Sequence, residues 1–221
     1  PEDGDAQDRF GSAVSVSSDG GTAVISARRD EDPNGTAGGS AYVFVNNDGQ
    51  WNQQQKLTPD DGTSYQTFGN SVSLADTGDH ALIGAIGDDV NGTASGSAYV
   101  FTGSNGQWSQ RQKISPDDGD ADDRFGEAVS LSGDGSTAVV GASRDEDPNG
   151  RRGGSAYVFS EEDGLLNQQQ KLAANDGDSQ DRFGFSVGIS EDGTTAGIGA
   201  RLDEKKRGKM EKRIEKQNKG L

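Results

Sequence analysis

Carboxylate and amide oxygens recur at alternate positions in two loops of this 221-residue chain. Both loops read RDEDPNG, and their candidate ligands are Asp30, Asp32 and Asn34 in the first loop and Asp145, Asp147 and Asn149 in the second. Oxygen donors spaced in this way, followed by a glycine, also open calcium-binding loops. The chemistry that these residues suggest is therefore the binding of a divalent cation, with Ca²⁺ as the candidate cofactor.

Two features favour a simpler interpretation of the same loops. The bidentate glutamate that closes a calcium loop is absent, because Ala41 and Ala156 stand at the corresponding positions. The sequence Asp-Pro-Asn-Gly is also a good turn between two strands. Two alternatives therefore stay open: tight turns that carry solvated charge, or weak divalent-cation sites.

Catalysis has no comparable set of residues. The chain has no cysteine, and its single histidine, His80, lies at the start of a strand-like run and does not recur. It also lacks a nucleophile elbow and a phosphate-binding loop. We therefore expect a protein that is not an enzyme.

Charge and hydropathy limit the partners. The formal net charge is −16, which argues against nucleic acid because its phosphates would be repelled. No apolar run approaches the length of a membrane span, so none is expected.

The elements that position the loops belong to a repeat. A Phe-Gly pair begins each copy, at Phe10, Phe68, Phe125 and Phe183, with spacings of 58, 57 and 58 residues. Three copies hold four strand-like runs, which in the third copy read AVSL, TAVVGA, GSAYVF and LLNQQQKL. Turn residues separate the runs. The units span about residues 8–65, 66–122, 123–180 and 181–204, and the last unit is partial because it ends after its second run.

A period of this length with four strands suits one blade of a β-propeller. A four-stranded sheet cannot bury both of its faces alone, so neighbouring blades must stack. The sequence therefore predicts an all-β fold, in which residues 1–204 form an open, partial arc of about three and a half four-stranded blades.

The same residues resemble a known family. The pattern FG…SVSLS…DG…TAVVGA…GSAYVF…QQQKL is similar to the FG-GAP repeat of integrin α-chain propellers and of many prokaryotic surface proteins. The Phe-Gly pairs are literal, and the second half of the motif survives as Gly-Ala at Gly84, Gly141 and Gly199. The resemblance implies a seven-bladed propeller in full-length relatives and a place on the cell surface or outside the cell.

One feature of that family is missing. Integrin-type repeats commonly carry an Asp-rich calcium loop between the first and second strands. Here that connection is only SSDGGTA, ADTGDHA, SGDGSTA or SEDGTTA. These turns hold too few carboxylates for about six to eight oxygen ligands, so the family's calcium site is not expected here.

The acidic residues are unevenly distributed. Successive strands of a blade run antiparallel, so the connections between second and third strands emerge on the same face as those between blades. These two loop classes carry 24 of the 35 acidic residues before residue 205. In integrin-like propellers they line the ligand-binding face. We name them here the acidic loop face and expect it to attract cations or basic partners.

Two functions from different classes follow. The first is a non-enzymatic module for adhesion or ligand recognition, which binds a protein or glycan through the acidic loop face of a cell-surface or secreted protein. The second is a purely structural repeat whose acidity is an adaptation to concentrated salt, because only three lysines precede residue 205. Self-association through open blade edges is a further expectation.

Residues 205–221 differ from everything before them. The segment KKRGKMEKRIEKQNKGL is strongly basic and holds the only methionine of the chain, Met210. Met210 and Ile214 are spaced for one side of a helix, so the tail could form a short basic helix. An unrelated end on a truncated gene is the alternative interpretation.

Overall fold

The structure is a computed structural model. It describes residues 7–31, 38–62, 65–146, 152–175, 178 and 180–201. The predicted basic tail at 205–221 lies outside the described residues, as do Asp32, Asn34, Asp147 and Asn149.

All regular structure in the described residues is β. The strands in chain order are β1 (Phe10–Val16), β2 (Thr22–Ala27), β3 (Ser40–Asn47), β4 (Gln50–Leu57), β5 (Phe68–Leu74), β6 (His80–Ala85), β7 (Ser97–Ser104), β8 (Gln107–Ile114), β9 (Phe125–Leu131), β10 (Thr137–Ala142), β11 (Ser155–Glu162), β12 (Leu165–Leu172), β13 (Phe183–Ile189) and β14 (Ala196–Ala200). The strands coincide with the alternating runs of the repeat.

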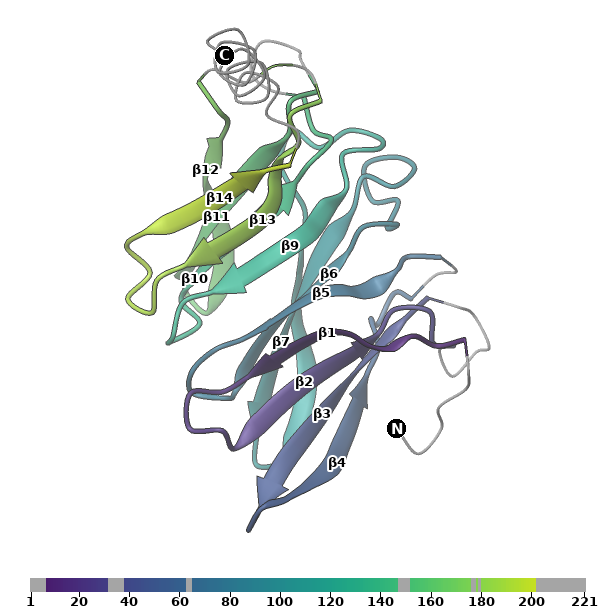
Figure 1. The fold of residues 1–221 in the computed structure, drawn as a ribbon, viewed down its shortest axis with the longest axis vertical. Coiled ribbons are helices and arrows are strands. Elements are labelled where there is room, and N and C mark those ends of the chain that lie inside the picture. Colours follow the sequence, from purple (N-terminus) through teal and green to yellow (C-terminus); the bar gives the residue numbers. More distant parts are fainter. Residues whose placement is uncertain are drawn as a thin grey trace, which may run out of the picture.

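These strands form three four-stranded antiparallel sheets and one two-stranded sheet. Each sheet is a meander in chain order, and the sheets follow one another as blades 1 to 4 (Figure 1). The first strands of successive blades, β1, β5, β9 and β13, contact one another. The predicted open propeller arc of about three and a half blades is confirmed.

The hydrophobic core lies between the blades. One cluster joins blade 1 to blade 2 and includes Val24, Val43 and Ile83. The other joins blade 2 to blade 3 and includes Leu82 and Val140. Ile83 and Leu82 are neighbours on β6 and belong to different clusters, because alternate residues of a strand point to opposite faces of its sheet. Stacking therefore buries both faces of blade 2.

Two glycines of the repeat are required where blades stack. A Cβ on Gly141 of β10 would lie 1.9 Å from the carbonyl oxygen of Gly184 in blade 4. Gly184 has a φ of +84°, and its own Cβ would lie 2.1 Å from the carbonyl oxygen of Ser155. The Phe-Gly pair of one blade therefore fits against the Gly-Ala pair of the blade before it, because neither glycine has a side chain.

The same Phe-Gly pair fixes the connections between blades. The amide of Phe68 donates to the carbonyl of Gly38 at 2.8 Å, and the amide of Phe183 donates to the carbonyl of Gly153 at 2.7 Å. Both acceptors lie in loops between the second and third strands of the preceding blade. The two loop classes of the acidic loop face are therefore joined by backbone hydrogen bonds.

Candidate functional site

A lysine on the outermost strand of each complete blade forms an ion-paired cluster beneath the acidic loop face. In blade 3, Lys171 Nζ lies 2.8 Å from Asp145, which follows β10, and 2.7 Å from Asp118, in the loop from β8 to β9. Blade 2 repeats this arrangement with Lys113, at 2.7 Å from Asp88 and 2.5 Å from Asp61. Each lysine therefore ties the loop that leads in from the preceding blade to its own blade.

Blade 1 contains the equivalent pair. Lys56 Nζ lies 2.9 Å from Asp30, whose side chain is only 5% exposed. The hydroxyl of Tyr42 donates to the same carboxylate at 2.5 Å. Lys56, Lys113 and Lys171 are the three lysines that precede residue 205, so every lysine of the propeller serves this position.

A tyrosine completes each cluster. The hydroxyl of Tyr157 donates to Asp145 at 2.7 Å and lies 3.0 Å from Asp118. The Lys171 ammonium lies 5.4 Å from the centre of the same ring, within reach of a cation–π interaction. The Phe125 ring packs edge-on against Tyr157, with centroids 5.5 Å apart. The phenylalanine of the Phe-Gly motif thus supports the tyrosine that orients the carboxylates.

The electrostatics of the clusters hold the ion pairs in their charged forms. Burial opposes ionisation, but hydrogen bonds with Asp118 and Asp145 raise the pKa of Lys171 above its usual value. In blade 2, burial likewise opposes ionisation of Asp88, but hydrogen bonds from Lys113 and Ser97 lower the pKa of its carboxyl. Burial, together with the neighbouring carboxylates, raises the pKa of Tyr157, so this hydroxyl stays a donor.

Next to this cluster, blade 3 holds a second buried carboxyl. Asp123 is 3% exposed. Burial raises the pKa of Asp123 to about 6, and the nearby Asp145 and Asp120 carboxylates add to the effect. In blade 2 the corresponding residue is Gln66, whose amide donates to Asp88 at 3.0 Å. Blade 3 therefore places a carboxyl where blade 2 has a neutral donor.

The predicted metal ligands divide between described and undescribed residues. Asp30 and Asp145 are buried, and each already holds a lysine and a tyrosine. The other four, Asp32, Asn34, Asp147 and Asn149, lie outside the described residues. Across the described part of the chain, no three His, Cys, Asp or Glu side chains gather in a way that could hold a metal ion. Calcium binding at these loops stays a prediction.

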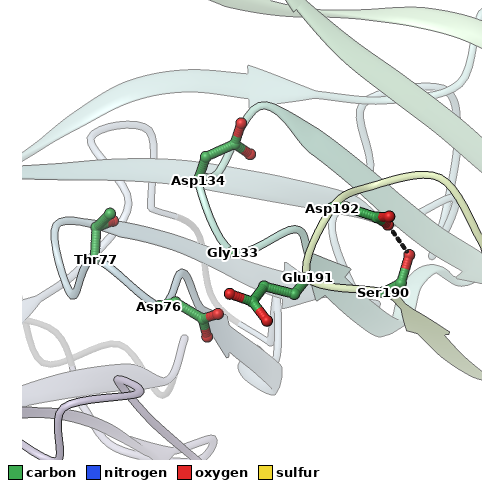
Figure 2. A pocket seen from close by; sticks show the side chains of 7 residues that line it. All are labelled: Asp76, Thr77, Gly133, Asp134, Ser190, Glu191 and Asp192. Atoms are coloured by element: carbon green, nitrogen blue, oxygen red, sulfur yellow. Dashed lines mark hydrogen bonds between the residues drawn. The ribbon is translucent and has the colours of Figure 1, made fainter.

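The opposite face of the arc carries a cleft of about 630 Å³. Turns of blades 2, 3 and 4 line it with Asp76, Thr77, Gly133, Asp134 and Ser190–Asp192 (Figure 2). Backbone hydrogen bonds run from turn to turn, from the Asp76 amide to the Gly133 carbonyl at 2.9 Å and from the Gly133 amide to the Glu191 carbonyl at 2.8 Å. The cleft is thus a continuation of the blade stacking.

The carboxylates of these turns are engaged locally. Figure 2 shows Asp192 bonded to Ser190, whose hydroxyl donates at 2.6 Å. This bond, with others from Thr194, lowers the pKa of Asp192 to about 2. Asp134 likewise accepts from the Ser132 hydroxyl at 2.7 Å and the Ser136 amide at 2.9 Å. Hydroxyl and amide donors therefore already bond these turn carboxylates, which fits the absence of a calcium loop in their sequences.

The sequence profile of the FG-GAP repeat matches the chain four times, at residues 1–44, 51–101, 108–159 and 166–211. The chain belongs to the FG-GAP repeat family. The match confirms the resemblance seen in the residues, and the FG-GAP motif marks the inter-blade contact described above. A search of the curated proteins finds no match to this FG-GAP chain.

The architecture also occurs in a solved structure. The crystal structure of Saccharomyces cerevisiae Sqt1 is similar with a TM-score of 0.51 at 14% identity, over 80% of this chain and 39% of that one. A putative 6-phosphogluconolactonase from Bacteroides fragilis gives a TM-score of 0.49 at 16% identity, over 74% of this chain and 39% of that one. The FG-GAP chain thus spans about two fifths of the length of each. The likeness to Sqt1 concerns the fold alone.

The lysine clusters are the part of the site that the sequence interpretation missed. The scarcity of lysine had suggested salt adaptation instead. The signal was the register: Lys56, Lys113 and Lys171 occupy the same position of the fourth run in three units. A charge retained at one position of a repeat, and absent elsewhere, indicates a specific partner.

Proposed function

We propose that this FG-GAP chain is a non-enzymatic β-propeller module that recognises a protein or glycan through the acidic loop face. The observation that carries the proposal is the pair of lysine bridges. Lys113 and Lys171 each fasten a loop between blades to the next blade, which makes the loops of this face a pre-organised surface.

The bridges also sort the carboxylates of this face. Asp88 and Asp145 are buried against lysine, whereas a second group of carboxylates is exposed on the same loops. The exposed members are Glu31, Asp60, Asp89, Asp117, Asp120, Asp122 and Glu146. Fixed loops with outward carboxylates suit a ligand that presents cationic groups or hydrogen-bond donors.

Location and ions belong to the same proposal. FG-GAP repeats are typical of extracellular and surface proteins, and we place this module there. No helix among the described residues is long and apolar enough to cross a membrane. Weak calcium binding at the RDEDPNG loops is retained as a secondary proposal, and self-association through open blade edges as an alternative that the oligomeric state in light scattering decides.

Two matched triple variants test recognition. Asp117→Asn, Asp120→Asn and Asp122→Asn remove three exposed charges from the β8–β9 loop on the acidic loop face. Glu161→Gln, Glu162→Gln and Asp163→Asn remove three exposed charges from the end of β11 and the turn after it, on the opposite face. The assay is binding of each purified chain to glycan and cationic-peptide arrays at physiological salt.

We expect the first triple variant to lose binding that the second retains. Equal loss in both variants would mean that net charge alone causes retention on the array. A wild-type chain that binds nothing above background would favour the purely structural, salt-adapted repeat.

A further inference from the structure

Blade 4 exposes groups that have partners in every complete blade. Among the described residues, its second strand, β14, pairs only with β13, whereas β2, β6 and β10 each pair with a third strand that reads Ser-Ala-Tyr-Val-Phe. The free edge of β14 carries Ala196, Gly197, Ile198, Gly199 and Ala200. An edge without charge, proline or long side chains is a template for another strand.

The aromatic contact of the motif is also incomplete in blade 4. Phe68 packs edge-on against Tyr99 and Phe101 of the third strand, and Phe125 does the same with its own blade's pair. Phe183 is half-buried and has no aromatic partner among the described residues. The missing rings are those that a third strand supplies.

A carboxylate near Phe183 has no ion-pair partner in the part of the chain that the structure describes. Asp181 is 5% exposed, and its Oδ1 is buried without a hydrogen-bond partner. The corresponding residue of blade 3, Asp123, lies within the electrostatic reach of Lys171 on the fourth strand. An added fourth strand with lysine at that position would bring a positive charge to Asp181.

Among the described residues, one glutamine of blade 3 lacks the backbone partner that the corresponding glutamines of blades 1 and 2 have. Gln55 of blade 1 clamps the next blade's outer strand, because its side chain accepts from the amide of Trp108 at 2.8 Å and donates to the carbonyl of that residue at 2.8 Å. Gln112 clamps the backbone of Leu166 in the same way, at 2.9 and 2.8 Å. Gln170, the third member of the series, is exposed and has no such partner in the described part of the chain.

We propose that this surface, formed by the β14 edge, Phe183, Asp181 and Gln170, binds a two-stranded β-hairpin from another polypeptide. The first strand of the hairpin reads Ser-Ala-Tyr-Val-Phe and adds to β14 by backbone pairing. The second carries lysine and meets Asp181 and the Gln170 amide. By the register of β10 with β11, tyrosine falls opposite Ile198 and phenylalanine opposite Ala196. The surface includes none of the exposed carboxylates named for the proposed recognition function.

The probe is a labelled synthetic peptide with the sequence of residues 154–172, GSAYVFSEEDGLLNQQQKL, added to the full chain. Fluorescence anisotropy measures binding, and saturable binding is expected. A peptide with serine for its tyrosine and phenylalanine should bind about tenfold more weakly or worse, since two buried aromatic contacts are lost.

Matched substitutions in the chain locate the contact. Phe183→Ala should weaken peptide binding about tenfold, whereas Phe10→Ala, at the same motif position in blade 1, should leave it unchanged. Gln170→Ala should weaken binding up to about tenfold by removing two hydrogen bonds, and its neighbour Gln169→Ala should not. Gln170 lies on an intact blade, so its result does not depend on how blade 4 tolerates the loss of Phe183.

Three results would overturn the proposal. The first is no saturable binding of the peptide. The second is equal weakening by the test and control substitutions. The third is a concentration-dependent dimer in light scattering that Gly197→Lys dissociates, because a second copy would then occupy the β14 edge; a Cβ at Gly197 meets open space, so lysine fits there.

Discussion

Replacing Lys171 with methionine tests whether the lysine clusters hold the blades together. Methionine keeps most of the apolar stem and removes the ammonium, so Asp145, with a side chain 4% exposed, is left as a buried charge whose partner among the described side chains is the Tyr157 hydroxyl. Breaking a buried ion pair by removing one partner costs about 3–5 kcal/mol of the free energy of unfolding. Asp118 is 51% exposed, so its share of the pairing is at most about 1 kcal/mol.

The assay is urea denaturation at fixed salt for Lys171→Met, Asp145→Asn, Asp118→Asn and the double variant Lys171→Met with Asp145→Asn. The double variant should recover most of the loss, because the buried charge and its partner are removed together. Lys113→Met is the internal comparison and should cost less, because the blade 2 carboxylate also accepts from a glutamine amide. Losses below about 1 kcal/mol, or single losses that simply add in the double variant, would refute the reasoning.

Three further predictions concern the buried carboxyl, the stacking and the ions. The folded-state pKa of Asp123 is raised to about 6, so its contribution to stability is full below about pH 4 and is lost as pH rises through about 6. Asp123→Gln should therefore raise the free energy of unfolding at pH 7 by up to about 3 kcal/mol and flatten that part of the pH profile. Gly141→Ala should cost about 2 kcal/mol or more in urea denaturation, because the added methyl meets the Gly184 carbonyl; a neutral result would mean that the blades can separate freely. Calcium should raise the melting temperature beyond sodium at equal ionic strength, and Asp32→Ala with Asp147→Ala should remove only that excess; interchangeable ions would leave the loops as turns.

The fold was predictable because the repeat makes each local signal appear several times. Alternating runs between turn residues gave the strands, and a four-run period gave the blade. The reason why the Phe-Gly pair requires glycine was harder to predict. Gly184 follows the start of a strand, and the carbonyl that excludes a side chain there belongs to Ser155 in the previous blade. A one-blade interpretation of the sequence could not supply that contact.

The site was less predictable than the fold for the same reason. Asp118 and Lys171 are 53 residues apart, and their ion pair exists only because one blade stacks on the next. Sequence spacing pointed instead to Asp145 as a metal ligand, because loop motifs are local. The structure shows that this carboxylate faces a lysine and a tyrosine of its own blade.

Buried and exposed carboxylates should respond differently to salt, although both count towards the net charge. Exposed pairs and exposed like charges are screened by salt, whereas buried pairs are screened much less. The Lys113 and Lys171 bridges contain one buried and one half-exposed carboxylate each, so their buried halves should persist at high salt. We therefore expect any salt dependence of folding to come from the outward carboxylates of the acidic loop face. A salt-adapted acidic surface and rigid loops for recognition would therefore be compatible in one molecule, because the outward carboxylates would carry the surface charge and the buried carboxylates would hold the loops.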